Sequence, residues 1–275
     1  MKIPLTVVIL AKNEEGAIAR CLESVESVDQ ILVFDSNSSD FTVRIAQQMG
    51  ASVIDFNWNG QYPKKKQWAL QNHEIRNDWV LFLDADEALS PSLVSEIRDL
   101  FDKSDMSSYG AYVIQLDYFF MGKLLRFGHK VKKRALLNRC CCSFPVIDDL
   151  HVSNMWEVEG HYQPICEKRV GNLRERITHI DPDPLYDYFS RHNRYSDWEA
   201  ELRMNSKMQK SVRDARTTQG ALFDRMPGKP FLFFVYSYIY RFGWRDGRAG
   251  FNYALALSFY YWQISIKVQE KKLHA

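Results

Sequence analysis

The sequence lacks the glycine-rich loops that bind phosphates after a first strand. Neither GxGxxG nor GxxxxGK[ST] occurs in its 275 residues, which argues against a dinucleotide site and against a P-loop. There is no internal repeat and no low-complexity tract, and the net charge of only +2 argues against nucleic acid as a partner. Because 46% of the residues are hydrophobic and 25% are charged, we expect a folded chain with a substantial core.

Cysteine is scarce in the sequence, and its spacing matches no known cysteine motif. Three of the five cysteines are consecutive, at 140–142, and no CxxC pair occurs. This pattern predicts reduced thiols and neither a disulfide framework nor a zinc site. A signal peptide is not expected either, because the apolar run after Lys2 is short and is broken by Lys12, Asn13 and Glu14.

Apolar runs alternate with helical patterns in the N-terminal half. The runs predict strands at 5–10, 31–34, 51–56 and 79–83, and the spacing between them predicts helices at 14–25, 41–49 and 64–73. Strands that are apolar on both faces and alternate with helices favour a parallel sheet, so the predicted fold class is α/β. Further on, we expect strands at 109–120 and 135–138, a loop at 140–154 and a helix at 185–202.

The C-terminal end differs from the rest of the chain. Residues 225–275 carry eight Lys and Arg against two Asp and Glu, and they hold 14 of the 38 aromatic residues. A membrane-spanning helix needs about 17–25 apolar residues. The apolar stretch 231–240 is too short for this, and the stretch 249–266 is barely long enough. We therefore expect helices lying on an anionic membrane, with core helices or a dimer contact as alternatives.

The proline pair around Gly228 marks a boundary. It predicts a catalytic domain over 1–226, with a donor half at about 1–104 and an acceptor half at about 105–226. The remaining residues, 227–275, are predicted to form a helical, membrane-associating extension.

Acidic and polar residues follow three of the predicted strands, at 12–15, 35–40 and 84–87. Ligands bind outside the carboxyl ends of the strands in an open parallel sheet. A D-x-D pair such as Asp84 and Asp86 can divide its work, with one carboxylate accepting ribose hydroxyls and the other binding Mg²⁺ or Mn²⁺. The cation would offset the charge on a departing diphosphate. The alternative is that both residues only cap the turn before a helix opened by Ser90.

The segments TVVILAKNEE, ILVFDSNSSDFT and DWVLFLDADEAL, spread over about residues 4–100, resemble the nucleotide-sugar-binding half of family 2 glycosyltransferases. Within that family, GWRDG at 243–247 is most similar to bacterial enzymes that extend lipopolysaccharide core or other surface glycans. The resemblance implies the inverting GT-A fold, a Rossmann-like, mostly parallel sheet flanked by helices. It also implies that Asp35 contacts the base, that Asp84 with Ala85 contacts the nucleotide, that Asp86 binds the metal, and that Lys12, Asn13 and Glu14 flank the pocket.

An inverting transfer is an in-line displacement, so a general base must deprotonate the acceptor hydroxyl. The candidates are Glu157 first, then Glu159 and then Asp149, in a segment where relatives place His or Asp before the acid and this chain has Trp156. The alternative for each is a solvated loop acid.

Further binding residues are less defined by the pattern. His179 is a candidate second metal ligand or a core histidine, and Lys65 with Gln67 could reach the diphosphate or the base or could begin a solvated helix. The basic run 130–134 could hold an anionic acceptor group or could be an exposed surface run.

Taken together, these features predict an inverting, Mg²⁺- or Mn²⁺-dependent transfer from a nucleotide sugar, UDP-linked, to a lipid-linked glycan such as lipopolysaccharide core. The predicted location is the cytoplasmic face of a bacterial inner membrane, in peripheral contact with anionic lipid. The alternatives are a polyprenyl-phosphate sugar synthase and a membrane-docked, non-catalytic GT-A scaffold.

Overall fold

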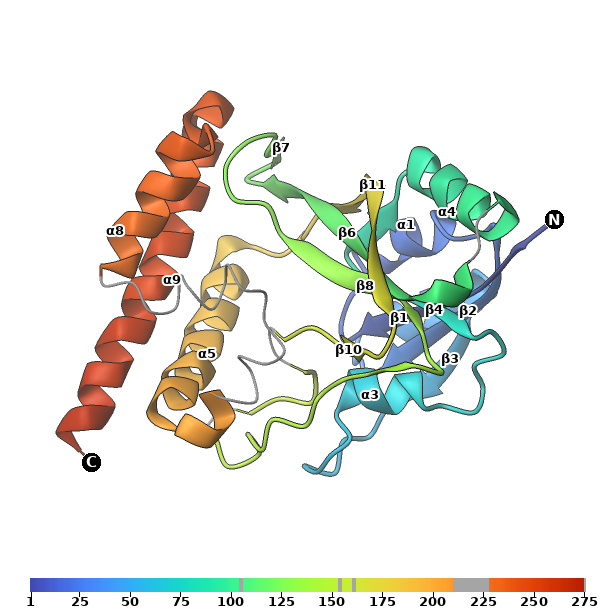
Figure 1. The fold of residues 1–275 in the computed structure, drawn as a ribbon, viewed down its shortest axis with the longest axis horizontal. Helices are drawn as coiled ribbons and strands as arrows, with labels where there is room; N and C mark the ends of the chain where they lie inside the picture. The colour runs from blue at the N-terminus through green and yellow to red at the C-terminus, as the bar shows by residue number, and fades with distance from the viewer. Residues whose placement is uncertain (104–105, 153–154, 160–161, 210–227, 275) are drawn as a thin grey trace. The chain divides into compact units, whose positions relative to one another are not determined.

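The computed structural model describes residues 1–103, 106–152, 155–159, 162–209 and 228–274. The chain forms two compact units. The first unit comprises residues 1–119, 131–144 and 164–182, and the second comprises residues 120–130, 145–163 and 183–275. Figure 1 shows the elements of both.

A parallel sheet forms the base of the first unit. Its strands, in the order β3-β2-β1-β4, are β3 (Ser52–Asp55), β2 (Val28–Asp35), β1 (Ile3–Ala11) and β4 (Trp79–Asp84). Helices α1 (Ile18–Glu23), α2 (Thr42–Gln48) and α3 (Lys65–Leu70) connect them. The register pairs Ala11 with Asp35 and Leu10 with Asp84, so the acidic carboxyl ends of β2 and β4 flank the end of β1.

The sheet continues beyond β4 in mixed orientation through β8 (Lys132–Asn138), β6 (Tyr109–Phe120), β11 (Arg169–His179) and β5 (Glu87–Leu89). The first unit also contains the 13-residue α4 (Pro91–Lys103) and the short η1 (Met106–Ser108), β9 (Cys142–Ser143) and β10 (Ile165–Cys166), while β7 (Lys123–Leu124), which pairs with β6, falls in the second unit. Strand β5 is antiparallel to the end of β11, with His179 opposite Glu87. This pairing brings the end of β11 next to the turn that follows β4.

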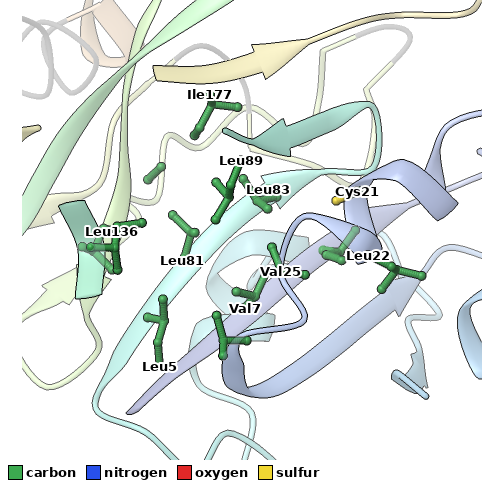
Figure 2. Packing of buried hydrophobic residues seen from close by; sticks show 14 of the residues in the cluster. Leu5, Val7, Cys21, Leu22, Val25, Leu81, Leu83, Leu89, Leu136 and Ile177 are labelled. Carbon is green, nitrogen blue, oxygen red and sulfur yellow. The ribbon is translucent and has the colours of Figure 1, made fainter. Parts of the chain in front are cut away.

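Aliphatic side chains fill the space between the sheet and α1. Leu5, Val7, Leu81 and Leu83 from the strands lie with Leu22 of α1 in one buried cluster, as Figure 2 shows. Each fully buried aliphatic side chain stabilises the fold by about 1.5–3 kcal/mol. The cluster therefore holds β1 and β4 in register, and with them the loops at their carboxyl ends.

The predicted fold class is confirmed, and the strands and helices predicted for the donor half are present with shifted ends. The strand expected at 109–120 has the observed bounds. The helix expected at 14–25 begins only at Ile18, because residues 14–17 form a turn in which Ala17 N donates to Glu14 O at 3.0 Å. Strand β11 was not predicted, because most of its residues are exposed or half-buried and it has no continuous apolar run.

The expectation that every cysteine is a reduced thiol is wrong. Cys142 and Cys166 form a disulfide between β9 and β10, where they are directly paired across the two strands. Cys21, Cys140 and Cys141 are free thiols. Sequence spacing could not reveal this pairing, because the two partners are 24 residues apart and only the antiparallel ladder brings them together.

The second unit is built on helices: α5 (Leu185–Met204), α8 (Lys229–Phe234), the π-helical η2 (Val235–Tyr240), η3 (Gly243–Asp246) and α9 (Gly247–Leu273). The segment α8–η2 packs beside α9 (Figure 1) through ring contacts such as Phe234 with Phe251 at 5.8 Å. Close approach at the turn requires glycine, since a Cβ on Gly250 would collide with the carbonyl oxygen of Gly243.

Helix α5 packs on α9 through ion pairs. Lys267 lies 2.6 Å from Asp197, and Lys271 lies 2.7 Å from Glu201. Among the described residues, no helix combines the length and the apolar character that crossing a membrane requires. The boundaries predicted at 104/105 and 226/227 stay predictions; the two compact units divide the chain at other points.

Candidate functional site

The loops after β1 and β2 are tied together by side-chain hydrogen bonds. Asn13 N donates to Ser38 Oγ at 2.8 Å, and Asn13 Oδ1 accepts from Ser39 N at 2.8 Å. Asp35 is buried and accepts from Ser38 N and Ser38 Oγ, at 2.8 and 2.5 Å. Glu14 N donates to Thr42 Oγ1 at 2.7 Å. The two loops therefore form a fixed rim at the carboxyl edge, whereas Lys12 beside them is exposed.

Helix α3 contributes buried polar groups to the same edge. The ammonium of Lys65 is buried and donates to Ala11 O at 2.9 Å and to Ser36 Oγ at 2.7 Å. Gln67 Oε1 accepts from Phe144 N at 2.6 Å. Because Lys65 points into the protein, the alternative of a solvated helix start is wrong for this residue. Its positive charge lies between the ends of β1 and β2.

Asp84 and Asp86 differ in their surroundings. The Asp84 side chain is 52% exposed and lies 3.4 Å from the Lys133 ammonium, which also pairs with the buried Glu87. Ala85, which lies between Asp84 and Asp86, is buried, and its N donates to Leu10 O at 3.2 Å. Desolvation by the surrounding protein acts to raise the pKa of Asp84, but the positive charges of Lys133 and Lys66 and the hydrogen bond from Lys133 act together against it, and the pKa falls to about 2. Asp84 is therefore a carboxylate at neutral pH, available to accept hydrogen bonds from hydroxyls.

Lys133 forms a bridge within the site and does not belong to an exposed basic run. Burial acts to lower its pKa, but the carboxylates of Asp84 and Glu87 raise the pKa above its ordinary value. Burial raises the pKa of Glu87, against the effect of the ammonium. Arg134 is likewise engaged, donating to Pro164 O at 2.7 Å. The hypothesis that residues 130–134 together hold an acceptor group stays a prediction.

His179 and Asp86 face each other. His179 Nδ1 lies 3.2 Å from Asp86 Oδ2, yet this buried nitrogen lacks hydrogen-bond geometry to any described group. The Tyr118 ring packs edge-on against the imidazole at 4.1 Å. Burial lowers the pKa of His179, and the neutral imidazole is the form that binds metals.

The spacing of these two atoms fits a divalent cation. Neighbouring ligands of an octahedral Mg²⁺, with bonds of about 2.0–2.1 Å, lie about 3 Å apart. The described residues contain no group of three or more His, Cys, Asp or Glu side chains that could hold a metal by themselves. Asp86 and His179 therefore suit an ion whose other ligands come from substrate phosphates and water.

Arg20 holds this pair in place, and nothing in the sequence singled it out. Its Nη2 donates to Asp86 O at 3.0 Å and to Ile180 O at 2.8 Å. Ile180 N in turn donates to Asp86 O at 3.1 Å. A single guanidinium on α1 thus joins the turn after β4 to the end of β11. A lone arginine in a predicted helix carries no signal for such a role.

The three candidate bases lie in the second unit. Asp149 is fully buried, and its Oδ2 accepts from Trp198 Nε1 at 2.7 Å. Glu159 is also buried, whereas Glu157 is half-buried. Trp156, next to Glu157, lies under the Arg194 guanidinium at 5.3 Å. Of the three carboxylates, Glu157 is therefore the most accessible to an acceptor; its role stays a prediction.

Comparison with known proteins decides the family. The model of the family described as "Glycosyl transferase family 2" matches residues 6–149. The chain belongs to glycosyl transferase family 2. This membership confirms the resemblance, the enzyme class and, with the observed parallel sheet, the GT-A fold class. Within the family match lie the predicted donor-site residues from Lys12 to Asp86, and Asp149, whereas Glu157, Glu159 and His179 lie beyond it.

This family 2 chain resembles two kinds of curated relative. It is 39% identical over 137 residues to an uncharacterized glycosyltransferase of Rickettsia typhi, covering 50% of this chain and 44% of that protein. The chain thus matches less than half the length of that relative. It is 26% identical over 285 residues to the lipopolysaccharide core biosynthesis glycosyltransferase LpsC of Rhizobium meliloti, covering 98% of this chain and 93% of that protein.

Solved structures give weaker likenesses. Glucosyl-3-phosphoglycerate synthase from Mycobacterium tuberculosis, in complex with Mn²⁺, UDP and glucosyl-3-phosphoglycerate, is 25% identical with a TM-score of 0.31, covering 43% of this chain and 44% of that one. S. aureus TarS 1–349 is 13% identical with a TM-score of 0.42, covering 94% and 90%.

Proposed function

We propose that this family 2 chain transfers a sugar, with inversion, from a UDP-linked donor to a lipid-linked glycan, with Mn²⁺ or Mg²⁺ bound at Asp86 and His179. The observation that carries the proposal is the Asp86–His179 pair, two ligand atoms 3.2 Å apart beside the ionised Asp84 at the carboxyl edge of the sheet. Such an edge is where open α/β sheets bind their ligands.

Each donor-site residue has a role that follows from its surroundings. Asp84, exposed and ionised, accepts hydrogen bonds from the ribose hydroxyls, and Asp35 faces the base. Asn13 and Glu14 with Lys12 form the rim of the nucleotide pocket, and Lys65 supplies a fixed positive charge behind it. When bound, the cation acts as a Lewis acid toward the departing diphosphate.

Glu157 is the proposed general base, because it is half-buried whereas Glu159 and Asp149 are buried. Deprotonation of the acceptor hydroxyl by its carboxylate would accompany the in-line displacement. Asp149 is a weaker candidate, since its oxygen already accepts the indole N–H of Trp198. Glu159 is buried, so an acceptor reaches it less easily.

The acceptor and the location are inferred from the relative and from the tail. The likeness to LpsC extends over 98% of the chain, which supports lipopolysaccharide core as the acceptor. An acceptor of this kind is anchored in lipid, so the enzyme would work in peripheral contact with anionic membrane at the cytoplasmic face of a bacterial inner membrane.

Calorimetry with UDP and Mn²⁺, paired with a transfer assay on core oligosaccharide acceptors, tests the proposal. Asp86→Ala and His179→Ala should each abolish metal-dependent UDP binding and transfer, while Asp102→Ala, an exposed acid on α4, should change neither. Full transfer activity in Asp86→Ala would refute the metal role.

The same assays separate the alternatives. Activity that survives removal of the Glu157, Glu159 and Asp149 carboxylates would favour a polyprenyl-phosphate acceptor, because a phosphate needs little deprotonation. Failure of the intact chain to bind any nucleotide diphosphate with Mn²⁺ would favour a non-catalytic scaffold.

A further inference from the structure

Exposed aromatic and aliphatic side chains line the outer side of the paired C-terminal helices. We call this set the aromatic face, and its members are Phe231, Ile239, Tyr240, Phe242, Trp244, Phe251, Leu255, Phe259, Trp262 and Ile266. Single exposed apolar residues are ordinary, but contiguous apolar patches mark interaction sites. The aromatic face lies on two helices that pack side by side and on the turn between them (Figure 1).

Helix α9 has two distinct sides. The inner side packs on α5, where the rings of Tyr260 and His192 lie 5.5 Å apart. The members of the aromatic face between Phe251 and Ile266 recur every three or four residues, so they form one stripe on the opposite side. At 1.5 Å per residue, this stripe is about 22 Å long. Phe259 and Trp262 stack on it with centroids 5.3 Å apart.

The charges at the turn between η2 and α9 are sorted by sign. Arg241, Arg245 and Arg248 are exposed, beside Phe242 and Trp244, each 53% exposed. The one acid of this turn, Asp246, is buried and accepts from Phe127 N at 2.8 Å. The turn therefore shows solvent cations and aromatic rings, with its negative charge directed inward.

Not all of the basic residues of the tail are outward. Lys267 and Lys271 form ion pairs with Asp197 and Glu201 of α5. The positive charge that a binding partner would contact is therefore smaller than the net charge of the tail sequence. Among the described residues of the tail, three of the four exposed cations, Arg241, Arg245 and Arg248, lie at the arginine turn, and the fourth is Lys272. Apolar rings beside arginines match the two layers of an anionic lipid surface, acyl chains below and phosphates above. On a second copy of this chain, the stripe from Phe251 to Ile266 contains no Asp or Glu that could pair with these arginines.

We infer that the aromatic face docks on an anionic lipid bilayer, with α8–η2 and α9 lying in the plane of the headgroups and the arginine turn bound to lipid phosphates. The inference deepens the proposed function, since it rests on that function for the lipid-linked acceptor. Among the described helices none is suited to cross a membrane, and helices that lie in the interface need only one apolar side.

Flotation with vesicles tests the inference without donor or metal. The full chain should float with vesicles of phosphatidylcholine mixed with phosphatidylglycerol, and weakly with phosphatidylcholine alone. Phe242→Ser with Trp244→Ser, and separately Phe259→Ser with Trp262→Ser, should each weaken binding about tenfold or more, from the apolar area they withhold. Arg245→Gln should weaken binding about fivefold, and added salt should act in the same direction.

Tyr186→Ser is the matched control, because this ring on α5 is 79% exposed and lies outside the aromatic face. It should leave flotation unchanged. Thermal unfolding and Mn²⁺-dependent UDP binding should match the parent chain in every variant, which separates lost docking from lost folding. Because Asp86→Ala should still float, a failed nucleotide site and a failed docking face give different results.

Two outcomes overturn the inference. One is a parent chain that does not float with anionic vesicles, or double variants that float as well as the parent. The other is a dimer in sedimentation analysis that dissociates when Phe259 and Trp262 are replaced, which would assign the aromatic face to a second copy.

Discussion

Removing the Arg20 guanidinium should loosen the proposed metal-ligand pair, Asp86 and His179, without changing either side chain. Arg20→Met keeps much of the aliphatic stem and deletes the donor that binds Asp86 O and Ile180 O, at 3.0 and 2.8 Å. Hydrogen bonds from charged groups contribute about 1.5–3 kcal/mol each. Since Arg20 is only half-buried, and the Ile180 N to Asp86 O bond would remain, we expect a loss of about 2–4 kcal/mol in unfolding free energy.

The effect on the metal should be separable from the effect on stability. Residues that orient metal ligands typically change metal affinity by about 10- to 100-fold when replaced. We therefore expect Arg20→Met to weaken Mn²⁺ binding in the presence of UDP by about that factor, measured by calorimetry at a temperature where the variant is folded. Arg20→Lys, which can reach one carbonyl, should bind Mn²⁺ with an affinity between those of the parent and of Arg20→Met.

Arg44→Met on α2 is the control, since the Arg44 guanidinium stacks on the Phe41 ring at 5.6 Å and binds nothing at the site. It should leave Mn²⁺ affinity unchanged. If Arg20→Met lowered the unfolding free energy but left Mn²⁺ affinity within threefold of the parent, Arg20 would be a structural tie only, and the positioning role would be refuted.

Two further predictions concern charges elsewhere in the fold. Lys133→Met leaves Glu87 buried without its cation, and breaking a buried pair in this way costs about 3–5 kcal/mol of unfolding free energy. In urea unfolding, the double variant with Glu87→Gln should recover a large part of this loss. A Lys133→Met variant as stable as the parent would contradict the pairing. Burial, aided by nearby cations, lowers the pKa of His129 to about 4 in the folded chain. Above about pH 6.5 the histidine is neutral in both the folded and the unfolded chain, whereas between about pH 6.5 and 4 mainly the unfolded chain gains a proton. Stability should therefore fall by up to about 3 kcal/mol between pH 6.5 and 4; His129→Gln should remove this part of the pH dependence in thermal melts, and an unchanged profile would count against it.

The parallel core could be predicted from the sequence because its physical cause is local. Strand β1 is buried almost throughout, so its residues form a continuous apolar run, and the polar residues after Ala11 mark its end. The same holds for β4 and the aspartates that follow it. Where a strand is covered on both faces, the residues themselves show it.

Strand β11 and the disulfide could not be predicted, because their causes are distant in the chain. Arg169 to His179 shows mostly half-buried and exposed positions, and only pairing with β6 and β5 makes it a strand. Lys133 is a similar case. The basic run predicted either a contact with an anionic acceptor group or an exposed surface, and not an ion pair with Glu87, which is 46 positions away.

The D-x-D motif was the strongest signal in the sequence, yet it contains only half of the candidate metal site. In the proposed site Asp86 would supply one ligand atom, and the other would come from His179 at the end of the unpredicted β11, 3.2 Å away. Their approach depends on β5, which follows directly after the motif and pairs with β11 so that Glu87 lies opposite His179. Two protein ligands leave most positions of a hard cation open, and a nucleotide diphosphate can fill them. A site built this way would bind metal and donor together, so the motif becomes specific only once the fold has brought His179 to it.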